Sequence, residues 1–148
     1  MPLIATARFG PLAYPENGAI EFPAGLPGFD RERAFILVEQ PELAPLVFLQ
    51  SLESPDLCLP AVPVAALAPE YELGILREDL EALGLDASRQ PVAGRDVLCL
   101  AILTAAPDCQ PTANLLAPVV INLAARRGVQ AVRADARYSH RHRLGEPC

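Results

Sequence analysis

Short runs of apolar and β-branched residues recur along this chain, and Pro, Gly, Asn and Asp separate them. Such spacing is typical of all-β proteins rather than of chains in which strands and helices alternate. The segment 78–85 differs, because leucines and acidic residues at helical spacing precede Gly84, and we expect one short helix there. Strands are predicted for the other runs, at 3–9, 19–22, 34–39, 46–52, 57–64, 97–104, 116–123 and 129–136.

Two of these runs have patterns that place them in a sheet. Residues 97–103 are apolar on both alternating faces, which predicts a central strand covered on both sides. In 129–138 the apolar residues alternate with Arg133, Asp135 and Arg137, which predicts a strand whose polar face meets solvent. We expect nine residues to be mostly buried in the core: Phe22, Phe29, Leu49, Leu98, Leu100, Ile102, Leu115, Val120 and Ile121.

The stretch 22–30 reads F-P-A-G-L-P-G-F-D. Gly25 and Gly28 flank a proline whose φ is locked, so we expect a rigid turn in which at least one glycine has a positive φ. Leu26 and Phe29 can fold back from this turn onto the core. The stretch 49–55, L-Q-S-L-E-S-P, is predicted to be a strand that ends in a polar turn.

The stretch 112–122 carries Asn114 and Asn122 inside an otherwise apolar run. Buried amides need hydrogen-bond partners, so we expect both asparagines to be satisfied structural groups that tie a bulge to an adjacent loop. Pro118 removes a ladder hydrogen bond, which favours an edge or bulged strand at this point.

Composition bounds the fold further. The chain has 148 residues, about the length of one domain, and we expect a single domain over 1–148 with an ordered core at about 3–144. Sixteen prolines, spread along the sequence, exclude long helices almost everywhere. The longest apolar stretches are shorter than the ~18 residues of a membrane helix. With no secretory signal pattern at the N-terminus, we expect a cytoplasmic protein that does not enter a membrane.

Charge divides the chain into two unequal parts. Residues 1–125 carry six arginines against sixteen acidic residues, a net charge of −10, whereas 126–148 carry six arginines against two acidic residues, a net charge of +4. An acidic body of this kind is unlike a nucleic-acid binder and suits a basic protein partner.

Catalytic and metal-binding motifs are missing from the sequence. Four cysteines have no CxxC spacing, and Cys58 and Cys99 are predicted to be small core residues. His140 and His142 lie beside arginines near the C-terminus, where an exposed tail is expected. Carboxylate pairs such as Glu70 and Glu72 have no partner base, so we expect no enzyme, no catalytic residue, no metal and no cofactor.

These stretches, in this order along the chain, resemble the flagellar assembly factor FliW family. The matching blocks are F-P-A-G-L-P-G-F-D at 22–30, L-Q-S-L-E-S-P at 49–55, L-A-I-L-T at 100–104, T-A-N-L-L-A-P-V-V-I-N at 112–122, G-V-Q-A-V at 128–132 and the closing segment 138–144. The chain departs from the family at 58–68, where Pro60 and Pro63 interrupt what is usually an extended apolar strand.

This resemblance implies an all-β fold that is an antiparallel β-barrel-like pseudobarrel, without enzymatic activity. It also implies two protein partners. One is flagellin, for which the family acts as a chaperone; the other is CsrA, a small basic dimer that represses translation of flagellin messenger RNA. FliW proteins take CsrA away from that message once flagellin has been exported.

Two alternatives come from other classes of function. The first is an RNA-binding module that uses the C-terminal arginines Arg126, Arg127, Arg133, Arg137, Arg141 and Arg143, although the sequence offers few aromatic residues for base stacking. The second is an undetected hydrolase, for which the sequence offers no nucleophile and base pair.

A candidate surface for CsrA is predicted from loop composition. Glu70 and Glu72 flank an aromatic residue, which suits a basic partner with one apolar anchor. The segment 105–111 is expected to be a proline-restricted loop that comes after the most buried strand. We therefore predict that Glu70, Glu72, Pro107 and Asp108 contribute to one CsrA-facing patch; two unrelated solvated loops are the alternative.

Overall fold

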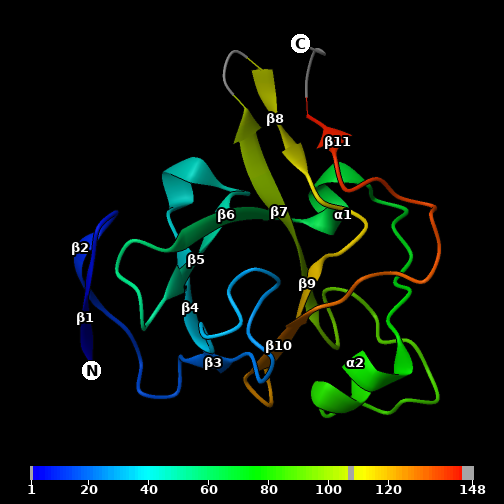
Figure 1. The fold of residues 1–148 in the computed structure, drawn as a ribbon, viewed down its shortest axis with the longest axis horizontal. Helices are drawn as coiled ribbons and strands as arrows, with labels where there is room; N and C mark the ends of the chain where they lie inside the picture. Colours follow the sequence, from blue (N-terminus) through cyan, green and yellow to red (C-terminus); the bar gives the residue numbers. More distant parts are fainter. Residues whose placement is uncertain (1, 107–108, 145–148) are drawn as a thin grey trace.

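The computed structural model describes residues 2–106 and 109–144. Seven strands close into a barrel in the order β7-β6-β5-β4-β3-β10-β9, and β9 pairs back onto β7 (Figure 1). All pairs in this ring are antiparallel except β3 with β10, which is parallel. The barrel strands are β3 (Ile20–Glu21), β4 (Ala34–Glu39), β5 (Val47–Ser51), β6 (Cys58–Pro63), β7 (Leu98–Ala106), β9 (Val119–Asn122) and β10 (Arg127–Gln130).

Strand β7 is longer than its neighbours in the barrel and continues beyond it as an arm (Figure 1). Its first residues pair with β9, and its last residues pair with β8 (Cys109–Ala113). Strand β11 (His142–Arg143) adds to the outer edge of β8. The segment 105–111, predicted to be a loop, thus belongs largely to the β7–β8 hairpin, and the predicted exposed tail is wrong for His142, which lies in β11.

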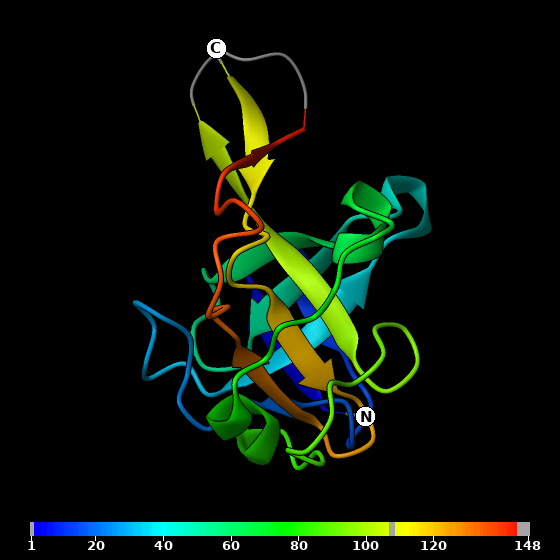
Figure 2. The same ribbon diagram turned by 90° about the vertical axis from the view of Figure 1, so that its right-hand side faces the viewer.

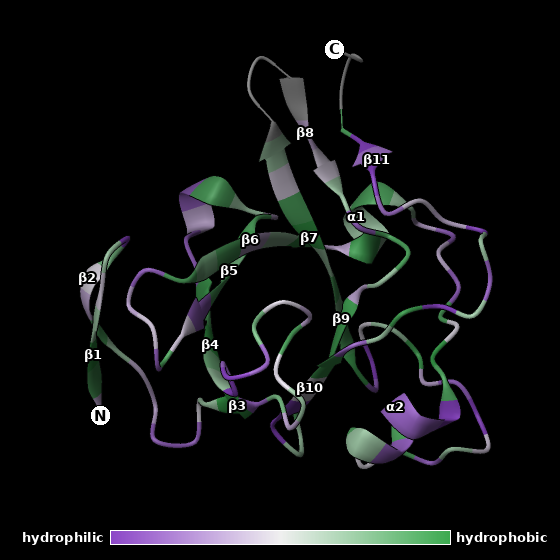
Figure 3. Cartoon of the chain, viewed as in Figure 1, coloured by the Kyte–Doolittle hydropathy of each residue, from purple (hydrophilic) through white to green (hydrophobic). Residues whose placement is uncertain are grey.

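Two apolar clusters lie on opposite sides of the barrel wall. The inner cluster fills the barrel and is built around Phe22, Phe35, Leu49 and Leu100. The outer cluster lies between β7, β9 and β10 and the segment that carries α1 (Val64–Leu67) and α2 (Arg77–Ala82). Figure 2 looks onto this covered face, and Figure 3 shows that α2 and β11 are largely hydrophilic whereas the barrel strands are mainly hydrophobic. The prediction that the strand at 97–103 is covered on both sides is confirmed for residues 99–101, whereas Leu98, Ile102 and Leu103 are half-buried.

The predicted helix is confirmed as α2, after which Gly84 has a φ of +76°. Helix α1, a 3₁₀ turn at Pro41–Leu43 and the hairpin of β1 (Leu3–Thr6) with β2 (Gly10–Ala13) were not predicted. Among the described residues, no helix has the length and apolar character needed to cross a membrane.

The sequence blocks 22–30, 49–55 and 112–122 have structural roles that the geometry explains. Gly25 and Gly28 both have positive φ, 65° and 83°, as the turn requires. Asn114 Oδ1 accepts hydrogen bonds from the backbone amides of residues 116 and 117, which shapes the bend between β8 and β9 rather than a bulge. Asn122 Nδ2 donates to the Leu83 carbonyl at 2.9 Å and ties β9 to the end of α2. The Glu53 carboxylate accepts from two backbone amides at the start of β4.

Two expectations about the core and the last strand are wrong. Phe29 is 42% exposed rather than buried, because its turn carries it to the mouth of a surface hollow. Leu98 and Ile102 are half-buried. Strand β10 ends at Gln130, but the amides of Ala131 and Arg133 still donate to the carbonyls of Pro118 and Leu116. Val129, Ala131 and Arg133 share the buried side while Val132 is 48% exposed, so the two predicted faces are reversed there. The other predicted core residues are buried.

Candidate partner-binding site

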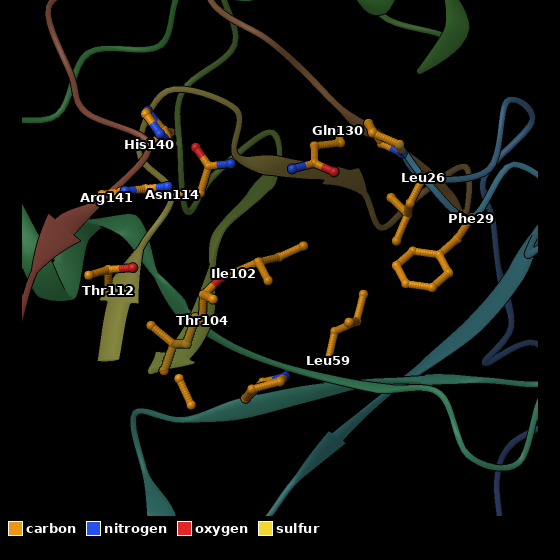
Figure 4. A pocket seen from close by; sticks show the side chains of 14 residues that line it. Leu26, Phe29, Leu59, Ile102, Thr104, Thr112, Asn114, Gln130, His140 and Arg141 are labelled. Atoms are coloured by element: carbon orange, nitrogen blue, oxygen red, sulfur yellow. The ribbon is translucent and has the colours of Figure 1, made fainter. Parts of the chain in front are cut away.

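A surface hollow of about 680 Å³ opens where the arm leaves the barrel. Figure 4 shows Leu26, Phe29 and Leu59 at one end, and Asn114, Thr112, His140 and Arg141 at the other. Ile102, Thr104 and Gln130 lie between the two ends. The hollow therefore has an apolar end and a polar, basic end, a combination that fixes the orientation of a bound segment.

The hollow lies where strand pairing between β6 and β7 stops. The two strands pair at Ala61–Pro63, and among the described residues their ladder does not extend to Pro60. Just before β6, the carbonyl of Leu57 accepts from the Ser51 amide of β5, so strand alternation directs the Pro60 nitrogen to the opposite side, toward β7. In β7 the carbonyl of Ile102 accepts from the Asn114 amide, on the side of β7 away from β6. Because carbonyls alternate along a strand, the carbonyl of the next residue, Leu103, points toward β6.

Proline explains this opening in the barrel wall. Continuing the register places Pro60 opposite Leu103 as the next hydrogen-bonded pair. Proline has no N–H to donate, so the Leu103 carbonyl gains no ladder bond from β6. We call this pair of residues, Pro60 and Leu103, the seam. Pro60 keeps its place opposite Phe48 of β5, because the proline nitrogen faces away from that strand.

The other wall of the hollow is the turn at 22–30. Leu26 and Phe29 form a small backbone bridge, with the Phe29 amide donating to the Leu26 carbonyl at 2.7 Å. A Cβ at Gly25 would lie 2.6 Å from the Asp30 Cα, so the chain can make this turn only with glycine there. The turn holds Phe29 at the mouth of the hollow.

A second feature, which we call the arginine cluster, joins the segment after β10 to the segment after α1. The Arg133 side chain is only 2% exposed, and its Nε donates to Asp135 at 2.8 Å. Its Nη1 donates to the Glu72 carbonyl. The guanidinium lies over the rings of Tyr71 and Tyr138. The cluster comprises Tyr71, Glu72, Arg133, Asp135, Arg137 and Tyr138.

Hydrogen bonding and burial explain the pKa shifts in and beside the arginine cluster. Hydrogen bonds from Arg133 hold the pKa of Asp135 below its ordinary value. Burial raises the pKa of Tyr71, whose hydroxyl donates to the Leu115 carbonyl at 2.6 Å. Burial also raises the pKa of Cys99, in the outer cluster, to about 12. The charged groups of the arginine cluster have hydrogen-bond or ion-pair partners within the chain. The cluster therefore has a structural role and connects the two segments.

The predicted patch residues have different positions. Glu70 is exposed, and the Glu72 carboxylate is also exposed but forms an ion pair with Arg137 at 3.0 Å. Tyr71, between them, points inward and packs on Tyr138 rather than serving as an exposed anchor. Pro107 and Asp108 lie outside the described residues, so their union with Glu70 in one patch stays a prediction.

Sequence reasoning assigned three apolar residues of the hollow to the core. Leu26 is buried in the inner cluster as expected, whereas Phe29 is exposed and Ile102 is half-buried. An apolar side chain in a strand or turn looks the same in the sequence whether it faces a core or a groove. The signal that could have found the hollow is Pro60 inside a predicted strand. Within residues 2–106 and 109–144, no group of His, Cys, Asp and Glu side chains is placed to hold a metal ion.

Comparison with known proteins gives a consistent match. The family model described as FliW protein matches residues 3–144. A flagellar assembly factor FliW of Syntrophomonas wolfei is 35% identical over 145 residues, which cover 97% of this chain and 89% of the relative. Another, from Geobacillus thermodenitrificans, is 35% identical over 142 residues and covers 95% and 94% of the two chains.

A solved structure agrees with the fold. The crystal structure of a flagellar assembly factor FliW superposes with a TM-score of 0.83 at 33% identity and covers 98% of both chains. The mostly β architecture and the closed barrel are thus shared with a solved relative.

Proposed function

The chain belongs to the FliW family of flagellar assembly factors, and from this membership we propose that it works by binding two proteins. One is CsrA, whose repression of flagellin messenger RNA it relieves. The other is flagellin, for which it serves as a cytoplasmic chaperone. Neither role requires catalysis.

The charge distribution of the folded chain supports a basic partner. Residues 1–125 carry a net charge of −10. In the basic C-terminal part, Arg133 is buried against Asp135, and Arg137 is paired with Glu72. Two of the six arginines there are thus already matched by carboxylates, which leaves the acidic body as the main electrostatic feature. Such a surface attracts a basic protein and repels RNA.

The same observation weakens the RNA-binding alternative. A phosphate-tracking surface needs several arginines that project together into solvent. Arg133 lies inside the arginine cluster, and its guanidinium contacts the rings of Tyr71 and Tyr138. These two tyrosines pack on each other, with ring centroids 4.2 Å apart, so they offer no free platform for stacking bases.

Titration calorimetry tests the proposal. The chain is titrated with CsrA and, separately, with flagellin, both from the same organism; CsrA is also titrated while bound to the leader of flagellin messenger RNA. We expect binding to each protein and release of RNA from CsrA. The absence of CsrA binding at about 10 μM overturns the regulatory role. Direct RNA binding by the chain that weakens steeply with salt supports the alternative.

A further inference from the structure

We propose that the hollow at the seam binds an extended acidic segment of a partner protein, which adds to the edge of β7 and places an apolar side chain against Phe29. This inference deepens the proposed function and rests on it, because it assigns the hollow to one partner. Exposed backbone, apolar surface and charge each support it.

Beyond the seam, β7 has a free backbone edge to which a strand can add. Beyond its pairing with β6, β7 continues to Ala106 with β8 on one side. The Leu103 carbonyl faces the other side, where Pro60 offers no N–H. The register of β7 against β8 shifts between Thr104 and Ala106, with the extra residue on β8. The alternation along β7 therefore still directs the amide of Ala105 to that side, and Ala105 is exposed. An extended segment can donate to this carbonyl and accept from this amide, which is how peptides add to a free strand edge.

The apolar end of the hollow supplies an anchor site. Phe29 is held at its mouth with 42% of its surface exposed, and Leu59 and Ile102 are half-buried beside it. The turn that carries Phe29 is fixed by Gly25 and by the backbone bridge to Leu26. A rigid aromatic contact of this kind lowers the cost of ordering on binding.

The opposite end selects charge. Arg141 and His140 line the hollow there, and no carboxylate of the described residues lies within ion-pair distance of Arg141. A segment with a carboxylate several residues away from its apolar anchor complements this end. A basic protein does not, so among the two proposed partners the segment belongs to flagellin and not to CsrA.

The test compares binding by matched variants. Intact flagellin, and overlapping synthetic peptides that tile its sequence, are titrated into the wild-type chain and into Phe29→Ala and Arg141→Glu. The control variants are Leu123→Ala, whose leucine is 45% exposed elsewhere, and Arg127→Glu, which changes net charge equally outside the hollow. We expect about a tenfold loss of affinity for each hollow variant and no change for the controls.

Amide hydrogen exchange identifies the mode of binding. The Ala105 amide is expected to exchange more slowly in the complex, because an added strand accepts from it. The peptides that bind are expected to carry a carboxylate several residues away from an apolar residue. Arg141 is exposed, so Arg141→Glu carries the test even if Phe29→Ala does not fold.

The outcomes separate this inference from the proposed function. If intact flagellin does not bind the wild-type chain, both the chaperone role and this inference are wrong. If flagellin binds equally to the wild-type chain and to Arg141→Glu, or leaves the Ala105 amide unprotected, the inference alone is wrong. Binding to the hollow by a helical or a basic peptide also overturns it.

Discussion

The arginine cluster and the hollow use similar side chains to opposite effect. Arg133 and Arg141 lie eight residues apart in the segment after β10; the Arg133 guanidinium lies over aromatic rings, whereas Arg141 lines the polar end of the hollow. Arg133 is saturated by Asp135, by the Glu72 carbonyl and by two tyrosine rings. Arg141 has no carboxylate partner among the described residues and lines an open space.

Residues whose hydrogen-bonding groups are all paired within the fold have a structural role, whereas residues with unpaired groups are available to a partner protein. A buried arginine must find its hydrogen bonds within the fold, and its loss leaves unpaired groups behind. An exposed arginine at the rim of a hollow costs the fold little and is available to a partner. Substitutions in the arginine cluster should therefore change stability, whereas substitutions at the hollow should change affinity.

The largest effect is expected from Arg133→Ala. The substitution removes hydrogen bonds to Asp135 and to the Glu72 carbonyl and also the packing of the guanidinium against Tyr71 and Tyr138, which should lower the free energy of unfolding by about 3 kcal/mol. Urea denaturation measures this loss of unfolding free energy. Arg141→Ala is the matched control, with a change expected to lie within about 0.5 kcal/mol. Equal effects of the two substitutions would remove the distinction between the regions.

The wall of the hollow offers a second, smaller effect on stability. Gly25→Ala places a Cβ 2.6 Å from backbone atoms at a φ of +65°, and we expect a loss of about 2 kcal/mol. Gly28→Ala is the matched control, because Gly28 also has a positive φ but has nothing within 4 Å of the added Cβ; its loss should be about 1 kcal/mol. Thermal melts that rank the two glycines in the reverse order would contradict the steric account.

Structural features that depend on neighbouring residues in the sequence could be predicted, whereas features that depend on distant contacts could not. The spacing of apolar runs located β4 and β5 closely, and the turn chemistry at Gly25 and Gly28 was correct, because strand alternation and positive φ are local properties. Arg133 was assigned to the wrong face: it shares the buried side with Val129 and Ala131, because distant groups such as Tyr71 supply contacts for its guanidinium that a local pattern does not reveal.

The hollow could not be predicted for a related reason. Its apolar end looked like core, and its basic end looked like a free tail, since nothing in the sequence shows that residues 140–143 return to β8. Pro60 is visible in the sequence as a departure from the family pattern, but its consequence depends on which strand its nitrogen faces. That direction is set only by the register of β6 against β5 and β7.

Closing the seam tests this account of Pro60. Pro60→Val restores an N–H opposite the Leu103 carbonyl, and the new amide at position 60 should exchange slowly in nuclear magnetic resonance measurements. The added hydrogen bond and the lost rigidity of proline offset each other, so the free energy of unfolding should change by no more than about 1 kcal/mol. Pro63→Val is the control, because its nitrogen faces away from β7. A rapidly exchanging amide at position 60 would show that proline does not cause the opening.

The smallest effect on stability is expected for the predicted CsrA patch. Glu70→Arg combined with Asp108→Arg reverses two charges; Glu70 is exposed and has no ion-pair partner among the described residues. We expect an almost unchanged melting temperature and a loss of CsrA affinity of about fivefold, larger at low salt because the attraction is electrostatic.

Glu72 is the informative comparison. Its ion pair with Arg137 is exposed at both ends, so Glu72→Gln should not change stability strongly, and a loss of CsrA affinity is expected if Glu72 shares the patch with Glu70. Unaltered CsrA affinity in the double variant would separate the CsrA surface from these loops, and weakened flagellin binding in the same variant would show that the patch and the hollow do not serve separate partners.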